Sequence, residues 1–96
     1  MSPYVILDIT IKDPAGYEEY KKQGAPTILA YGGKPLARGE GIEVIEGSWQ
    51  PKRIVIIEFN SMKDAKLWWN SPEYCEAKKL RHKSADTNVI LVEGLK

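Results

Sequence analysis

Cysteine and histidine are almost absent from this chain of 96 residues, which contains one of each. A single thiol, Cys75, cannot form an internal disulfide, and His82 at an unrelated spacing does not complete a set of zinc ligands. We therefore expect no metal and no cofactor, a packing role for Cys75 and a solvent-exposed His82 at a helix end. The absence of disulfides favours a reducing, cytoplasmic setting.

Long apolar runs and an excess of one charge sign are also missing. No segment has the roughly 20 apolar residues that a bilayer span requires, and the N-terminus carries no signal-like stretch. Fourteen basic and thirteen acidic residues give a net charge of +1, so no long-range field attracts nucleic acid or an anionic membrane. We expect neither as a partner, and we expect residues 1–96 to form one domain with a small core that gains from association.

What the chain does contain is a pair of apolar strands that each carry a carboxylate. The strand expected over residues 4–11 includes Asp8, and the strand over residues 53–59 includes Glu58. Alternate residues of the first strand form one face, and this face is apolar. The other face is also partly apolar, because it carries Tyr4. Both faces of the sheet therefore need cover, and a chain of this length has too few helices to supply it.

Helix signals separate the strands. Asp13-Pro14 starts a helix that we expect to be kinked or broken near Gly24 and Pro26 and to stop at Gly32-Gly33. A bent strand with a bulge at residues 39–41 is expected over 34–46. Ser61 begins a second helix, and Pro72 restarts a third whose basic run, residues 78–83, reads as a solvated end. A last strand is expected over 87–93.

The order β-α-β-β-α-β indicates an α+β fold of the ferredoxin-like split βαβ type. It predicts a four-stranded antiparallel sheet with strand order 4-1-3-2 and both helical segments on one face. We expect the first and third strands to be central, parallel neighbours. The bare face predicts a homodimer joined through Ile6, Ile54 and Ile56, with Trp49 as an interface anchor.

Several short motifs occur in order along the chain: Tyr4-Val5-Ile6, Asp13-Pro14, Tyr31-Gly32-Gly33, Arg38-Gly39, Glu46-Gly47, Glu58-Phe59, Asn70-Ser71-Pro72-Glu73-Tyr74 and Val92-Glu93-Gly94. Together they resemble the domain-of-unknown-function family numbered 1330, over essentially the whole chain. The resemblance implies a dimeric α/β barrel, in which two ferredoxin-like sheets pack face to face. The superfamily also holds antibiotic-biosynthesis-type monooxygenases and haem-degrading enzymes. It implies no established reaction, because one fold hosts many functions.

The candidate catalytic residues are Asp8, Arg38 and Glu58. If the two acids lie on neighbouring strands, one pKa would rise toward neutrality and the pair would suit acid/base chemistry, while Arg38 could hold one acid ionised. We expect the three side chains to converge on one cavity per subunit. The alternative is a structural ion network at the dimer interface.

Tyr17 and Trp69 are the candidate substrate-binding residues at the edge of this cavity, whereas Tyr20 and Trp68 read as core. Two functions remain open. The chain is a cofactor-free oxygenase or isomerase acting on a small organic substrate, or it is a non-catalytic ligand-binding or structural homodimer.

Overall fold

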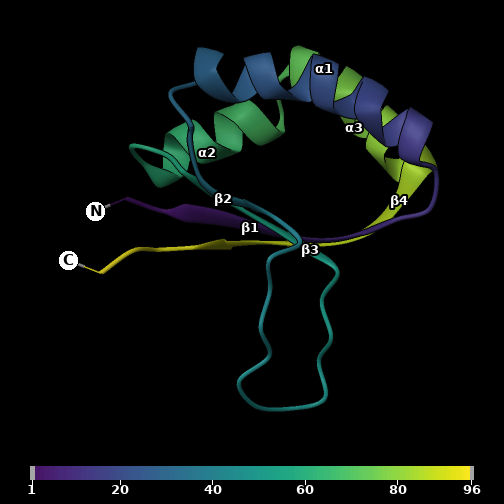
Figure 1. Cartoon of the computed structure of the whole chain (residues 1–96). Coiled ribbons are helices and arrows are strands. Elements are labelled where there is room, and N and C mark those ends of the chain that lie inside the picture. The colour runs from purple at the N-terminus through teal and green to yellow at the C-terminus, as the bar shows by residue number, and fades with distance from the viewer. Residues whose placement is uncertain (1, 96) are drawn as a thin grey trace.

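The computed structural model describes residues 2–95 as one four-stranded sheet with three helices on one side (Figure 1). Its elements follow one another along the chain as β1 (Tyr4–Ile11), α1 (Pro14–Ala30), β2 (Lys34–Gly39), β3 (Arg53–Glu58), α2 (Met62–Trp69), α3 (Pro72–Ser84) and β4 (Ala85–Val92). The sheet order is β2-β3-β1-β4. The predicted ferredoxin-like α+β fold, its strand order and the one-sided helices are confirmed.

The direction of the two central strands differs from the prediction. β1 and β3 are antiparallel, with Asp8 opposite Ile54 and Tyr4 opposite Glu58. The physical reason is the crossover: α1 carries the chain from β1 to β2, and β3 returns antiparallel between these two strands. The expectation of parallel neighbours was therefore wrong.

Helix α1 is continuous and not broken at Pro26. Proline removes one backbone donor inside a helix, but Thr27 donates from Oγ1 to the carbonyl oxygen of Gly24 over 2.6 Å. Thr27 Oγ1 also accepts a hydrogen bond from Trp68 Nε1 at 3.0 Å, which ties this turn to α2. The helix ends at Ala30, just before the predicted stop at Gly32, where φ is +82° and a side chain would be strained.

β2 is shorter than predicted. It stops at Gly39, and the register shift lies between Pro35 and Ala37 instead of at residues 39–41. Residues 40–52 form a long connection, here called the β2–β3 arm, which projects from the sheet on the side away from the helices (Figure 1). Trp49 in this arm is 62% exposed, and its Nε1 donates to Asp8 Oδ2 at 3.2 Å.

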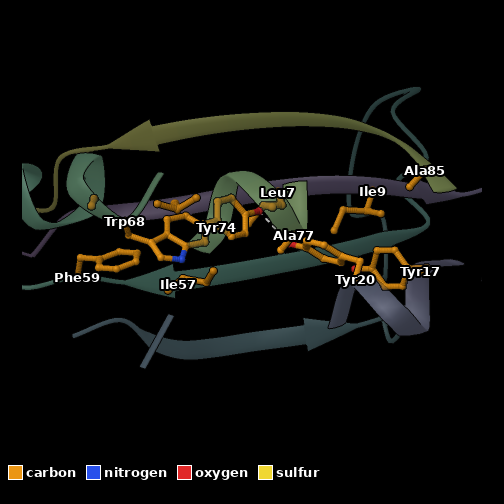
Figure 2. Close-up of a cluster of buried hydrophobic side chains, with 12 residues drawn as sticks. Leu7, Ile9, Tyr17, Tyr20, Ile57, Phe59, Trp68, Tyr74, Ala77 and Ala85 are labelled. Atoms are coloured by element: carbon orange, nitrogen blue, oxygen red, sulfur yellow. Dashed lines mark hydrogen bonds between the residues drawn. The ribbon is translucent and has the colours of Figure 1, made fainter. Parts of the chain in front are cut away.

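The core lies between the sheet and the helices (Figure 2). The helix-facing side chains Val5, Leu7 and Ile9 are at most 4% exposed. Aromatic rings fill the centre of this layer, with the ring centroids of Trp68 and Tyr74 4.1 Å apart. The structure places Arg81 here too, 1% exposed, so the basic run 78–83 is not wholly solvated. Arg81 lies seven residues after Tyr74 and shares its inner helix face.

The opposite face of the sheet is open. The half-buried Ile6, Ile54 and Ile56 lie on it, and Ile90 on β4 is 55% exposed. The arm borders this face and forms an apolar groove of about 490 Å³ with it. No helix among residues 2–95 is long and apolar enough to cross a membrane.

Candidate functional site

A small pocket lies between α1 and the helix-facing side of the sheet. Its volume is about 60 Å³, and its walls are mainly apolar. The lining comes from α1 and from strands β1, β2 and β3, and consists of Leu7, Ile9, Tyr17, Tyr20, Lys21, Gly24, Ala25, Ile28, Arg38, Arg53, Val55 and Ile57. We call it the α1 pocket. Three cations, Lys21, Arg38 and Arg53, therefore meet at one apolar cavity, which is the arrangement that fixes a charged head group beside a hydrophobic wall.

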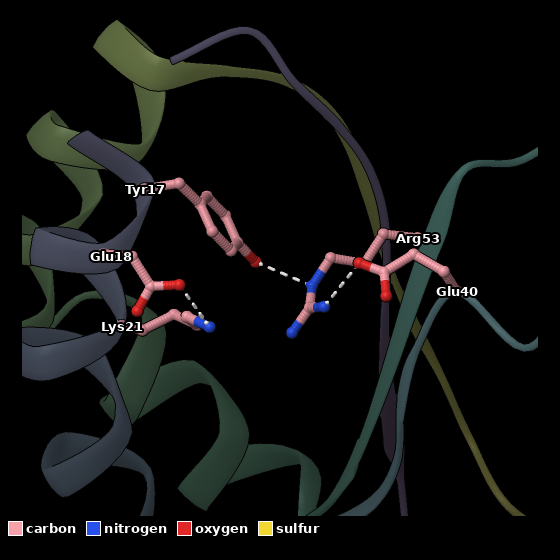
Figure 3. A network of polar contacts seen from close by, with 5 residues as sticks. All are labelled: Tyr17, Glu18, Lys21, Glu40 and Arg53. Atoms are coloured by element: carbon pink, nitrogen blue, oxygen red, sulfur yellow. Dashed lines mark hydrogen bonds and ion pairs between the residues drawn. The ribbon is translucent and has the colours of Figure 1, made fainter. Parts of the chain in front are cut away.

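Arg53 is the most buried of these cations, at 8% exposure. Its Nε donates to Tyr17 Oη at 3.2 Å, and its Nη1 pairs with Glu40 Oε1 at 3.1 Å (Figure 3). Burial works against the charge of Arg53, but the hydrogen bond to Tyr17 and the contact with Glu40 outweigh it and raise its pKa above the ordinary value. Arg53 thus stays charged and holds Tyr17 in place, with the guanidinium carbon 5.5 Å from the ring centroid.

The Tyr17 hydroxyl keeps a proton to donate. Its oxygen accepts from Arg53, and the hydroxyl donates to no acceptor among residues 2–95. A phenol whose oxygen is held by a guanidinium is a good donor to an anion, because the positive charge polarises the O–H bond. The site therefore offers Tyr17 as a hydrogen-bond donor as well as the three cations.

The other two cations differ in their partners. Lys21 Nζ contacts Glu18 Oε1 at 2.9 Å on the surface of α1, and this contact lowers the pKa of the Glu18 carboxyl (Figure 3). Arg38 on β2 lies opposite Val55 in the register, so it shares the helix-facing side. Arg38 takes part in no ion pair within the described residues, which leaves it as the cation most available to a ligand.

Asp8 and Glu58 share the open face, as predicted, but they are not neighbours. Because β1 and β3 are antiparallel, Asp8 lies four residues along β3 from Glu58, or about 13 Å at a rise of ~3.3 Å per residue. Asp8 accepts from Trp49, and Glu58 lies opposite Lys34 on β2. The two acids therefore do not form the close pair that the acid/base hypothesis requires.

The predicted convergence of Asp8, Arg38 and Glu58 is not found in the subunit, because Arg38 projects to the other side of the sheet. The structure does bring Arg38 and Tyr17 together in the α1 pocket. Trp69 lies elsewhere, in a second cavity of about 260 Å³ between α2 and β4. Whether any of these residues is functional stays a prediction.

Sequence reasoning missed Arg53 and Lys21, and it placed Tyr20 only in the core. Arg53 carried a usable signal: it precedes Val55 and Ile57 by even steps and so belongs to the inward side of β3. An inward-facing arginine at a strand end needs a partner, and that requirement alone marks it as a candidate. The contact between Arg53 and Tyr17 could not be predicted in this way, because the two residues are 36 positions apart in the sequence.

Solved structures support the fold. A protein of unknown function from Rhodopseudomonas palustris aligns with a TM-score of 0.79 at 21% identity, covering 99% of this chain and 83% of the other. The cofactor-independent oxygenase SnoaB from Streptomyces nogalater aligns at 0.71 and 10% identity, covering 99% and 94%. A dimeric ferredoxin-like protein of unknown function from Jannaschia sp. aligns at 0.72 and 10% identity, covering 98% and 100%.

Likeness at such low identity shows the fold alone. No curated protein matches the chain in a sequence comparison. The family model described as domain of unknown function DUF1330 matches residues 2–95. The chain therefore belongs to the DUF1330 family.

Proposed function

We propose that this chain binds a small organic anion in the α1 pocket, and that the bound anion reacts there without a cofactor. The observation that carries the proposal is the meeting of Lys21, Arg38 and Arg53 at one apolar cavity. Two of these cations already have carboxylate partners, so the free charge belongs to Arg38. A carboxylate or enolate at the pocket mouth can therefore pair with Arg38 and accept from Tyr17.

The size of the pocket limits the ligand. A volume of about 60 Å³ holds a few water-sized groups, whereas sites for drug-sized molecules measure roughly 300–1,000 Å³. The apolar side chains Leu7, Ile9 and Ile57 line the inner wall. The matching ligand is a short organic acid with a small hydrocarbon body.

The same geometry supports a cofactor-free oxygenase or isomerase. Both reactions begin with the loss of a proton from the carbon beside the ligand's carbonyl to a solvent base, which leaves an enolate that fixed cations and a hydroxyl donor stabilise where its charge develops. In an isomerase acting on an unsaturated acid, the conjugated enolate takes a proton back from solvent at a different carbon of the conjugated system. In an oxygenase, the enolate supplies the electrons that reduce O₂. The likeness in fold to a cofactor-independent oxygenase is compatible with the second route.

The alternative is a non-catalytic ligand-binding or structural homodimer, and the open face of the sheet favours the dimer part of it. Ile6, Ile54 and Ile56 are only half covered there, next to the apolar β2–β3 arm. Dimeric proteins are among the structures with this fold. A second copy on this face would bury the apolar surface and leave the α1 pocket, on the other side of the sheet, open to ligand.

The proposed binding of an anion is tested by titrating propionate into the wild-type chain and into the Arg38→Gln variant. The Gly24 and Ala25 amide signals are followed by NMR. We expect the dissociation constant of Arg38→Gln to be at least about tenfold larger, because a hydrogen bond to a charged group contributes about 1.5 kcal/mol or more. Lys34→Gln, which removes a cation from the open side of the same strand, is the control and should bind as the wild type does. Equal binding by all three proteins would refute the proposed site.

The proposed reaction of the bound anion is tested with pyruvate in D₂O. Enolate formation exchanges the methyl protons for deuterium, which NMR detects. Reaction with O₂ consumes oxygen, which an oxygen electrode measures in the same solution. Exchange or oxygen uptake above the buffer rate, and lost in Arg38→Gln, supports catalysis. Tight binding with neither signal would leave the chain a ligand-binding protein.

A further inference from the structure

Arg81 is a buried cation without an acid partner. Its side chain is 1% exposed, and Nη1 donates to Thr87 Oγ1 on β4. Its Nε is buried and has no hydrogen-bond partner, and no carboxylate among residues 2–95 forms an ion pair with it. Burying an ion in this way costs several kcal/mol unless another charge or dipole compensates it.

Aromatic rings provide part of this compensation. The guanidinium carbon lies 6.0 Å from the ring centroid of Tyr20 and 5.7 Å from that of Trp69. Such contacts contribute about 0.5–2 kcal/mol each. Neither ring carries a full negative charge, so the positive potential around Arg81 is only partly cancelled.

A pair of hydroxyls connects this potential to the α1 pocket. Tyr20 Oη and Tyr74 Oη lie 2.9 Å apart, and Tyr20 lines the pocket (Figure 2). Burial raises the pKa of Tyr74, with Arg81 opposing the rise, and burial also raises the pKa of Tyr20. Both phenols thus keep their protons, and each hydroxyl can donate and accept, so Tyr74 can donate to Tyr20 while Tyr20 donates to a third group.

We propose that the α1 pocket takes a short acid with a second oxygen, a 2-oxo acid, and that the Tyr20 hydroxyl donates to that second oxygen. Tyr20 is then a catalytic residue, and Tyr74 and Arg81 are positioning residues that strengthen its hydrogen bond. This inference rests on the proposed function. Arg38 and Tyr17 bind the carboxylate at the mouth, and Tyr20 polarises the carbonyl or stabilises the enolate oxygen deeper in the pocket.

Pyruvate and propionate test the inference, because they have equal charge at neutral pH and nearly equal size but only pyruvate has the carbonyl oxygen. The readout is the ratio of the propionate to the pyruvate dissociation constant, followed by NMR at Gly24. We expect a ratio of about ten in the wild type, the factor given by one hydrogen bond of ~1.4 kcal/mol. Tyr20→Phe should bring the ratio to about one, and Tyr31→Phe, which removes a hydroxyl bonded to Glu73 on the surface, should leave it unchanged.

Arg81 is tested through rescue. Arg81→Met should lower the ratio at least threefold, and Arg81→Lys, which keeps the charge, should restore most of it. If Arg81→Met does not fold, Tyr74→Phe takes its place, with the same expected fall. A merely structural Arg81 would alter the melting temperature but not the ratio.

The outcomes separate the two proposals. If both acids bind and Arg38→Gln weakens both, but the ratio is the same in wild type and Tyr20→Phe, the inference is wrong and the proposed function stands. If neither acid binds the wild type at millimolar concentrations, at least 50 times the protein concentration, both the proposed function and this inference are wrong.

Discussion

Arg53 and Tyr17 join the sheet to α1 through a hydrogen bond from Nε to Oη of 3.2 Å. The contact holds a buried guanidinium and a phenol side chain in the wall of the same pocket, with Glu40 of the β2–β3 arm as the second partner of Arg53. Breaking this contact would free Tyr17 and leave a buried polar group without its partner. The break should therefore lower both the stability of the fold and the affinity for the ligand.

Arg53→Gln should therefore weaken propionate binding about tenfold and lower the free energy of unfolding by about 1–3 kcal/mol, the cost of a buried unsatisfied polar group. Urea denaturation and the NMR titration measure the two effects. Lys52→Gln, at the exposed neighbouring position, is the control for the loss of one charge. A loss of stability with unchanged propionate affinity would make Arg53 purely structural.

Gly24 lines the α1 pocket beside the ring of Tyr20. A Cβ at this position would lie 3.3 Å from Tyr20 Cε1, so the ring must give way slightly. Gly24→Ala gains up to ~1 kcal/mol of helix propensity, and we expect unchanged or higher stability together with a preference for acetate over butyrate. Affinity for both acids equal to that of the wild type would show that the ligand does not approach Gly24.

The buried tyrosines predict alkaline unfolding. The pKa of Tyr20 and of Tyr74 is raised above the ordinary value of 10.0, chiefly by burial. In the unfolded chain these phenols ionise near pH 10 while in the folded chain they stay protonated, so their contribution is full below pH 10 and falls as pH rises above it. Melting temperatures at pH 8 to 11 should fall steeply above 10, and less steeply for Tyr20→Phe. A curve flat to pH 11 in the wild type would contradict this linkage.

The α3 cap predicts a local effect on stability. Ser71 Oγ accepts from the Tyr74 backbone N–H at 3.1 Å and donates to the Trp68 carbonyl at 2.8 Å, at 4% exposure. Ser71→Ala should cost about 1–2 kcal/mol. Asp13→Ala is the matched control, because Asp13 is the N-cap of α1 but its side chain makes no cap hydrogen bond. Equal losses in the two variants would show that the cap bond contributes nothing.

The open face predicts the assembly. Ile56→Asp places a charge in the apolar centre of this face, where a second copy would bury it without a partner. We expect the wild type to sediment at twice 10.8 kDa and the variant at 10.8 kDa. Leu67→Asp, on the exposed side of α2, is the control and should remain dimeric. A wild type that sediments as a monomer at micromolar concentration would refute the dimer.

The fold was predictable because local patterns determine it. Alternation of apolar residues in β1 and β3, Pro14 and Pro72 at helix starts and Gly32 at a helix end each follow from one short segment. The site was much less predictable, because strand direction decides which side chains meet. Reversing β3 moves Glu58 away from Asp8. The predicted order of elements already implied this direction, because a crossover from β1 to β2 makes β3 return antiparallel between them, and the expectation of parallel neighbours overlooked that constraint.

The contacts that define the candidate site are also distant in sequence. Tyr20 and Tyr74 are 54 residues apart, and Arg81 belongs to a basic run that resembles any solvated helix end. Only the packing of α1 against α3 and the sheet brings these residues together. The register of Arg38 was missed for a different reason: a bulge between Pro35 and Ala37 changes which face each residue of β2 takes.

Chemical-shift mapping with propionate tests the central claim most directly, because it reports which side of the sheet the anion occupies. The account predicts shifts clustered at Gly24, Ala25, Arg38 and Val55, around the α1 pocket, and the need for a higher propionate concentration to produce them in Arg38→Gln. Shifts confined to Ile6, Asp8 and Glu58 on the open face, or no shift at all at saturating millimolar propionate, would contradict it.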